Sequence, residues 1–428
     1  MPVSRIHTTN DLPAGPKVSV VIPVYGVEPW LAECLDSVLA QTLTEIEVLC
    51  VDDASPDRCG EILDEYAARD SRMRVFHLKE NRRQGYGRNL GMDHAQGTYI
   101  YLLDSDDRIR PEALERLYAL AEADSLDGIF FDSEVFYENE RLARKFTFYH
   151  PVRGDHYEDR VQRGEELFNA MMDHGEWNSY IQRQFWRRAF LEREGIRFPE
   201  GVEHEDEVFT FKAALAAERV RLTHDRFFLY RIRENSVVTS DPAPKNFHGY
   251  LLDYDEMNRF VRERGLSSPQ IASNLGRIRM HFEQYYQRLH EANDLRALFP
   301  EGRPRELFDL FEAGVQSQQY YLDYVADIRD ECVRAGTVCI YGAGMIAERV
   351  WRGLTSCGVI IDRFLVTSAE GNPKALFGRP VTPVPEFAAA GKGAELPPVV
   401  IALGRGAWQD VAERLEAAGA RFLYYQHP

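Results

Sequence analysis

The feature that most constrains the fold is a regular alternation of apolar runs and amphipathic segments in the first third of the chain. The run KVSVVIPVY is almost unbroken in β-branched residues, and one helical face follows it, made of Leu31, Cys34, Leu35, Val38 and Leu39. IEVLCVDD, RVFHL, TYIYLLD and GIFFDSEVF continue the series of strands, with helical segments between them. Strands that alternate with helices form parallel sheets covered by helices. The sequence therefore predicts an α/β fold with a mostly parallel sheet.

Polar side chains gather where the predicted strands end. Tyr25 follows the first strand, and Asp53 follows the second. The fourth strand runs into YLLDSDDRI, which crowds Asp104, Asp106 and Asp107 around one serine. Parallel sheets bind ligands outside the carboxyl ends of their strands, so we expect these groups to surround one site. Neighbouring carboxylates raise one another's pKa and destabilise the fold unless a cation compensates them, which predicts a cation at this edge.

Composition narrows the class of protein. A length of 428 residues predicts about two or three domains. The formal net charge of -17 argues against a nucleic-acid binder, which needs basic stripes. The six cysteines form no CxxC pair and no zinc-ligand spacing, as expected of reduced thiols. No apolar run reaches membrane-spanning length, so we expect a cytoplasmic protein, with a peripheral place at the inner face of the membrane as the alternative.

Three segments together carry a family resemblance. VSVVIPVYGVEPWLAECLDSVLAQT, VLCVDDASPD and GRNLGMDHAQGTYIYLLDSDD, in this order and spacing, resemble the family-2 glycosyltransferases, which have the GT-A fold. The resemblance covers roughly residues 17–240. It implies that Asp104 and Asp106 form the DxD motif, which holds Mn²⁺ or Mg²⁺ together with the sugar nucleotide. Asp106 is expected to bind the metal, and Asp104 the ribose or the metal. A hard cation bound by carboxylates and a diphosphate would neutralise the acid cluster.

The same resemblance implies the rest of a nucleotide site, with a UDP-sugar as the favoured donor. Asp53 would accept the N–H of a pyrimidine base, and Tyr25 would stack on its flat face. Pro23 is assigned to the same site. Arg88 would pair with the nucleotide or its phosphates.

A later segment supplies candidates for the base that an inverting transfer requires. FPEGVEHEDEVFTFKAALAA resembles the "ED" region of many bacterial members of the family, and Asp206 occupies the place of the catalytic base, with Glu205 as the alternative. A structural explanation stays open, because the helix dipole favours acids in any first turn. FFLYRIRENSVVTS looks like the family's "YR.R..S" segment, which predicts a lining of the donor or acceptor site by Arg231, Arg233 and Ser236.

The sequence after residue 245 predicts a helical segment and a small α/β module. Residues 246–335 have helical periods and read as a helical bridge. Residues 336–428 resemble the small Rossmann-like modules of polysaccharide-biosynthesis proteins, with Gly342, Gly344 and Ala347 in the spacing GxGxxA. Such a turn predicts either a second nucleotide site or a structural role for the glycines. The expected division is a tail over 1–16, a GT-A domain over 17–245, the bridge, and this module.

Three functions compete on this evidence. The first is a metal-dependent inverting glycosyltransferase, of the hexosyl or N-acetylhexosaminyl type, acting on a saccharide, lipid-linked or protein-linked glycan in surface polysaccharide or glycoconjugate synthesis. The second is a nucleotidyltransferase, which would need a glycine-rich basic loop that PVYGVEPW does not provide. The third is a nucleotide-binding scaffold, or an NAD enzyme, working through the C-terminal module, which would leave the N-terminal acids unexplained. We therefore favour the glycosyltransferase; the donor sugar, the acceptor and the oligomeric state stay open.

Overall fold

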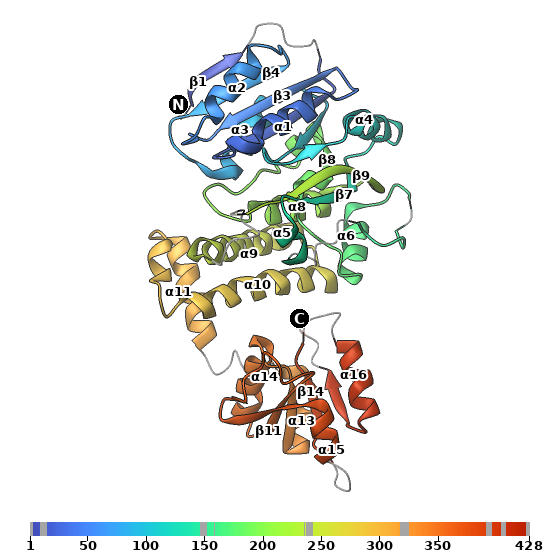
Figure 1. Cartoon of the computed structure of the whole chain (residues 1–428), viewed down its shortest axis with the longest axis vertical. Helices are drawn as coiled ribbons and strands as arrows, with labels where there is room; N and C mark the ends of the chain where they lie inside the picture. Colours follow the sequence, from blue (N-terminus) through green and yellow to red (C-terminus); the bar gives the residue numbers. More distant parts are fainter. Residues whose placement is uncertain are drawn as a thin grey trace. The chain divides into compact units, whose positions relative to one another are not determined.

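The fold is seen in a computed structural model, which describes residues 3–8, 15–145, 152–157, 159–234, 236, 243–316, 325–390, 396–403 and 408–424. The chain divides into two compact units, Met1–Asn293 and Asp294–Pro428. Each unit contains a sheet with helices beside it (Figure 1). The first sheet is large and mostly parallel and the second is smaller, which confirms the predicted α/β fold class.

The first sheet places the candidate residues along one edge. Its order is β1-β4-β3-β2-β5-β8-β7-β9-β6. β4, β3, β2 and β5 are parallel neighbours, β7 is parallel to β9, and β8 runs antiparallel between β5 and β7. β1, within the predicted tail, pairs antiparallel with β4. The strands are β1 Val3–Thr8, β2 Val18–Val24, β3 Ile46–Asp52, β4 Met73–Leu78, β5 Tyr99–Leu102, β6 Arg108–Ile109, β7 Gly128–Tyr137, β8 Gln184–Arg187 and β9 Val220–Ile232.

Helices bury their apolar stripes against this sheet. Every residue of β2 and β3 is buried, as expected for strands covered on both faces, and α1 buries Leu31, Cys34, Leu35 and Val38 in the same core. The helices of the first unit are α1 Glu28–Leu39, α2 Cys59–Ala67, α3 Arg83–His94, α4 Ala113–Ala123, α5 Glu140–Lys145, α6 Gly164–Asp173, the short 3₁₀ turn η1 Ile181–Arg183, α7 Arg188–Arg193, α8 Glu205–Ala216, α9 Pro244–Arg264 and α10 Pro269–Leu289.

The segment predicted as a helical bridge begins with the hairpin of α9 and α10. α9 has Pro244 in its first turn and ends at Gly265, whose φ of 62° suits the left-handed C-terminal position. Ser268 caps α10 by accepting a hydrogen bond from the backbone N–H of Ile271 at 3.1 Å. Both helices belong to the first unit, and α9 packs on α8. The rest of the predicted bridge opens the second unit, with η2 Leu295–Leu298, α11 Arg303–Gln316 and α13 Ala326–Ala335. Residues 317–324 lie outside the described ranges.

The second unit is a small α/β domain around the sheet β12-β13-β11-β10-β14-β15. After β10 the chain turns through Gly342, whose φ is 123° and whose added methyl group would lie 2.8 Å from the carbonyl oxygen of Ala402. Only glycine fits both this φ and this space at residue 342. Gly344 is the N-cap of α14. The elements are β10 Thr337–Tyr341, α14 Met345–Ser356, β11 Ile360–Val366, β12 Ala375–Leu376, β13 Arg379–Pro383, α15 Val384–Ala390, β14 Val399–Ile401, α16 Trp408–Ala417 and β15 Phe422–Tyr424.

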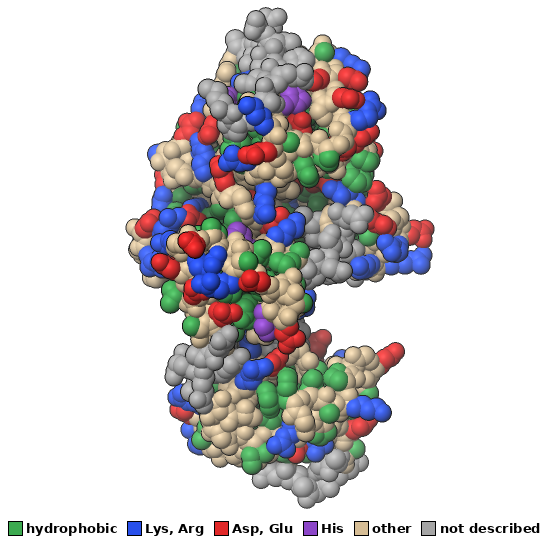
Figure 2. Space-filling view, turned by 90° about the vertical axis from the view of Figure 1, so that its left-hand side faces the viewer, with side chains coloured by type: hydrophobic (Ala, Val, Ile, Leu, Met, Phe, Trp, Pro, Cys, Tyr) green, Lys and Arg blue, Asp and Glu red, His purple; other side chains and the backbone are tan. Residues whose placement is uncertain are grey.

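The surface carries charged side chains of both signs. Figure 2 shows basic and acidic side chains interspersed over the face it draws, with no continuous basic stripe among the described residues there. Over the described ranges, no helix is both long enough and apolar enough to cross a membrane.

Candidate active site

The acid cluster lies between β5 and β6, where the chain turns tightly and the backbone N–H of Asp107 donates to the carbonyl oxygen of Asp104 at 3.1 Å. Burial raises the pKa of Asp106, and the neighbouring Asp104 carboxylate raises it further. Burial, followed by the charges of Asp106 and Asp104, raises the pKa of Asp107 well above its usual range. The mutual repulsion expected from the sequence is therefore present in the fold.

Guanidinium and amide groups surround Asp104 and Asp106, the two acids predicted to form the DxD motif. Arg88, from α3, donates to Asp104 Oδ1 at 2.7 Å and also pairs with Glu205 at the start of α8. Gln182, from η1, donates to Asp104 Oδ2 at 2.5 Å. Arg233 Nε donates to Asp106 Oδ2 at 2.7 Å. Segments far apart in the sequence thus meet at these two carboxylates.

The predicted "YR.R..S" segment is joined to the cluster by its arginines. The backbone N–H of Arg231, in β9, donates to Asp107 Oδ1 at 2.7 Å, and its Nε donates to the carbonyl oxygen of Asp106 at 2.8 Å. Arg233 lies with its guanidinium carbon 4.2 Å from the ring centroid of Trp30, a cation–π contact. Ser236 follows them and is partly buried. The structure therefore brings both arginines to the acids.

Three acids fill the first turn of α8, and they differ in their partners. Glu205 is 5% exposed and pairs with Arg88. Glu207 accepts from Arg277 of α10 at 2.7 Å and also from Ser179. The carboxylate of Asp206, within α8, makes no hydrogen bond to any side chain or backbone group that the structure describes. Burial raises the pKa of Asp206 well above its usual range, and the neighbouring Glu205 and Glu207 raise it further.

The residues expected around the pyrimidine base of the donor lie at the ends of β2 and β3. The backbone N–H of Asp53 donates to the carbonyl oxygen of Val24 at 2.9 Å, which joins the two strand ends. Asp53 Oδ1 accepts from the backbone N–H of Arg82 at 2.6 Å, and burial raises the pKa of this carboxyl. Pro23 lies in β2, and Tyr25, just after it, is 50% exposed. An exposed ring at this edge of the sheet fits stacking on a planar ligand.

Other residues at the site cannot be found from a single sequence. No motif in the sequence points to Gln182. Asn89, within the GRN motif, bonds both backbone groups of Phe198: its Nδ2 donates to the carbonyl oxygen at 2.9 Å, and its Oδ1 accepts from the N–H at 2.9 Å. Asn89 thereby fixes the segment before α8 to α3. Gly342 and Gly344 lie in the second unit.

Gly85 lets α3 approach the segment that leads into α8. A methyl group on Gly85 would lie 2.3 Å from the carbonyl oxygen of Pro199 and 3.3 Å from the side chain of Glu205. We therefore expect Gly85→Ala to destabilise the first unit by about 1–3 kcal/mol, because backbone atoms must shift. The unfolding temperature and the rate of UDP release from a UDP-sugar should both fall.

Gly87 supplies the matched control on the same helix. Its added methyl group would meet Pro23 at 3.4 Å and Val51 at 3.7 Å, which are ordinary contacts. Gly87→Ala should leave stability unchanged or raise it by up to about 1 kcal/mol, as for an unstrained helical glycine. Equal unfolding temperatures for the two variants would contradict the close approach at Gly85.

The fold is of the GT-A class. The chain resembles the solved structure of Staphylococcus aureus TarS 1-349 in complex with UDP-GlcNAc, with a TM-score of 0.50 and 19% identity over 80% of this chain and 89% of that one. At that identity the likeness speaks for the fold alone. The fold so shown agrees with the one expected from the sequence.

Sequence comparison gives the family. The family model "Glycosyl transferase family 2" matches residues 19–187. The uncharacterized glycosyltransferase EpsJ of Bacillus subtilis is 34% identical over 59% of this chain and 72% of that protein. The poly(ribitol-phosphate) beta-glucosyltransferase of Bacillus spizizenii is 30% identical over 55% of this chain and 36% of that protein. The chain belongs to the family-2 glycosyltransferases, which confirms both the resemblance and the enzyme class.

Proposed function

We propose that this glycosyltransferase moves a sugar, with inversion, from a nucleotide donor to a glycan acceptor, and that Asp206 is the general base. The observation that carries the proposal is the Asp206 carboxylate, which alone among the three acids of its turn is not held by a described partner. Glu205 shares Arg88 with Asp104, so the base lies one residue from the ion pair that links α8 to the DxD motif. A base must accept a proton, and a carboxylate already bound to a guanidinium is poorly suited to do so.

The pKa shift of Asp206 supports the same assignment. Its raised pKa makes the ionised carboxylate a stronger proton acceptor than an exposed aspartate. In an inverting transfer this carboxylate would take the proton of the acceptor hydroxyl as that oxygen attacks the anomeric carbon. Glu205 stays the alternative; its pKa is also raised, by burial first, although the nearby Arg88 lowers it.

The chemistry of the acid cluster fits a divalent cation. Asp104 and Asp106 offer hard carboxylate oxygens, which Mg²⁺ and Mn²⁺ prefer, and their repulsion is what a cation would relieve. Among the described residues, no three His, Cys, Asp or Glu side chains gather as a complete protein site. Two carboxylates plus donor phosphates are the usual composition for Mg²⁺. When bound, the cation would stabilise negative charge on the diphosphate leaving group.

The donor residues keep the roles expected from the sequence as part of the proposal. Tyr25 would stack on the base, Asp53 would accept its N–H through the oxygen not used by Arg82, and Pro23 would line the site. Arg88 is 2% exposed and bound to two acids, and its Nε has no partner among the described residues, so it would pair with the nucleotide or its phosphates. The arginines at 231 and 233, with Ser236, would line the donor or acceptor site.

The names of two relatives support a glycan polymer as the product. One acts on poly(ribitol-phosphate), and another, 31% identical over 52% of this chain and 62% of that protein, is the succinoglycan biosynthesis protein ExoO of Rhizobium meliloti. We infer a saccharide, lipid-linked or protein-linked glycan acceptor in polysaccharide synthesis. A UDP-sugar is the favoured donor, and the reaction would take place in the cytoplasm or at the inner face of the membrane.

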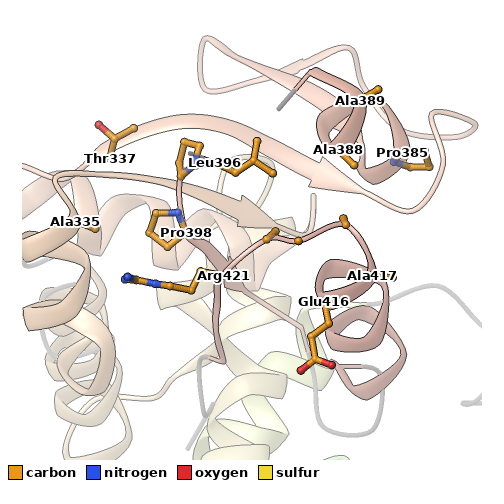
Figure 3. Close-up of a pocket in the computed structure, with 14 residues that line it drawn as sticks. Ala335, Thr337, Pro385, Ala388, Ala389, Leu396, Pro398, Glu416, Ala417 and Arg421 are labelled. Atoms are coloured by element: carbon orange, nitrogen blue, oxygen red, sulfur yellow. The ribbon is translucent and has the colours of Figure 1, made fainter. Parts of the chain in front are cut away.

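For the C-terminal module we propose a second nucleotide site at the turn of Gly342 and Gly344. The support is the glycine-only turn that opens α14. A cavity of about 1250 Å³ in the same unit lies elsewhere, at the amino ends of the strands (Figure 3). It is lined by Thr337 at the start of β10, Pro398 just before β14 and Arg421 just before β15. That end of a parallel sheet is opposite to the nucleotide crevice.

Incubation of the full chain with UDP-sugars and Mn²⁺ would test the main proposal. We expect slow UDP release from one donor, because water replaces the missing acceptor, and faster release when a suitable glycan is added. The same donor without Mn²⁺, or with excess chelator, should give a much lower rate. Absence of UDP release from any of a panel of UDP-hexoses and UDP-N-acetylhexosamines would count against a UDP-sugar donor.

A further inference from the structure

The segment before α8 contains a strained residue. His204 is the N-cap of α8 and has a φ of 68°, in the left-handed region that residues other than glycine rarely adopt. Asp206 is the second residue of the helix that this turn starts. The backbone at His204 therefore sets the direction in which α8 presents Asp206. A strained conformation of this kind persists only when surrounding contacts hold it.

Helix α9 supplies those contacts through one face. Asn246 Nδ2 donates to His204 Nε2 at 2.9 Å. The ring of Tyr250 stacks on that of His204, with 4.0 Å between centroids and 14° between planes. Asn246 and Tyr250 are four residues apart, so they lie on one side of the helix. Both polar and apolar parts of the His204 ring are thus fixed by α9.

Gly249 explains how α9 comes close enough to make these contacts. A methyl group at Gly249 would lie 2.2 Å from the carbonyl oxygen of Glu203, the residue before His204. The backbone of α9 therefore packs directly on the backbone of the turn. On the other side, Gly85 and Asn89 bring α3 against residues 198–199 and the side chain of Glu205. Two helices hold the turn between them.

We propose that α9 is a positioning element of the active site, in which Asn246 and Tyr250 hold His204 so that Asp206 faces the donor. The proposal rests on the proposed function of Asp206 as the base. It extends the active-site machinery to residues 246 and 250 of α9, beyond residue 245, where the sequence predicted the end of the GT-A domain. Asn246 and Tyr250 are positioning residues, since they act through His204 and not on the substrate.

The neighbouring helices supply cations to two of the three acids of α8. Arg88 of α3 pairs with Glu205, and Arg277 of α10 pairs with Glu207. One turn beyond Tyr250, Asp253 of α9 is fully buried, and burial raises its pKa well above the usual range.

Variants of the full-length chain test the proposal. Asn246→Ala and Tyr250→Ala should each lower kcat for UDP release from the UDP-glucose or UDP-GlcNAc that the wild type turns over, by about 10- to 100-fold, as expected for a displaced catalytic group. The Kd for UDP, measured by calorimetry with Mn²⁺, should stay within about twofold, because the contacts that Asn246 and Tyr250 make to the active site go to His204 and not to the donor residues. Tyr250→Phe keeps the stacked ring and should restore the rate.

Tyr254 provides the matched control, because it lies on the same helix but packs against Phe282 of α10, with 5.3 Å between ring centroids. Tyr254→Ala removes an equally large ring and should lower stability with little change in kcat. If kcat in Asn246→Ala and Tyr250→Ala equals that in Tyr254→Ala, the proposal is overturned.

His204→Gly keeps the test decisive even where Tyr250→Ala does not fold. Glycine adopts the positive φ without strain, so the turn can form while both contacts to α9 are lost. A reduced kcat with unchanged UDP binding is expected, and a wild-type kcat in the folded His204→Gly protein would refute the positioning role. Failure of the base assignment would appear separately, as full transfer in Asp206→Asn.

Discussion

Replacing Asp106 by alanine should reduce sugar transfer by about 10³-fold or more while leaving the protein folded, because the loss of a bound cation removes several kcal/mol of transition-state stabilisation. The fold should tolerate the change, since the Asp106 carboxylate is disfavoured by burial and by Asp104. Asp104→Ala should have a similar effect on transfer. UDP release in the presence of Mn²⁺ measures the first effect, and thermal unfolding the second.

The control for this prediction removes a carboxylate that also pairs with an arginine but lies outside the cluster. Glu134 is about half exposed and pairs with Arg110, so Glu134→Ala should change neither transfer nor stability appreciably. Undiminished turnover in Asp106→Ala, or full wild-type activity in excess chelator, would show that the acid cluster does not act through a cation.

The sheet and its active edge could be predicted because both depend on local patterns. β2 and β3 are buried along their whole length, which is what an unbroken apolar run in a parallel sheet requires. Polar residues after successive parallel strands converge without any further information, and Asp53, Asp104 and Asp106 do lie at those strand ends. Together with the order of the motifs, this was enough to identify the family.

The contacts that complete the cluster could not be predicted, because they join segments far apart in the sequence. β8 enters the sheet antiparallel between β5 and β7, and this topology brings Gln182 to Asp104. Periodicity shows which face of α9 is apolar, but it does not name the partner of that face. Only the fold shows that Asn246 reaches His204, or that Gly249 marks a close backbone approach.

The sequence also could not decide among the three acids of EHEDE, because their partners come from distant segments. Three consecutive carboxylates in a first turn all suit the helix dipole, so sequence pattern alone leaves each one eligible. The structure separates them by their cations, since Arg88 comes from α3 to Glu205 and Arg277 comes from α10 to Glu207. The base assignment for Asp206 stays a prediction, and the following variant tests it.

Asp206→Asn should lower transfer by about 10²-fold or more while UDP and metal bind nearly as in the wild type, because asparagine keeps the shape but cannot take a proton. The expected stability follows from the sign of the pKa shift. The folded state holds the proton of Asp206 more tightly than the unfolded state, so ionisation destabilises the fold as the pH rises above the ordinary aspartate pKa. Asparagine lacks that ionisation, and Asp206→Asn should be at least as stable as the wild type at neutral pH.

These two results together separate the base from a merely structural acid. If Asp206 served only to favour the first turn of α8 through its charge, the asparagine variant would lose a little stability and keep its rate. A catalytic base predicts the reverse, with the rate lost and the stability kept or raised. Near wild-type transfer to a glycan acceptor would remove Asp206 from the mechanism and direct attention to Glu205, whose release from Arg88 would then have to accompany donor binding.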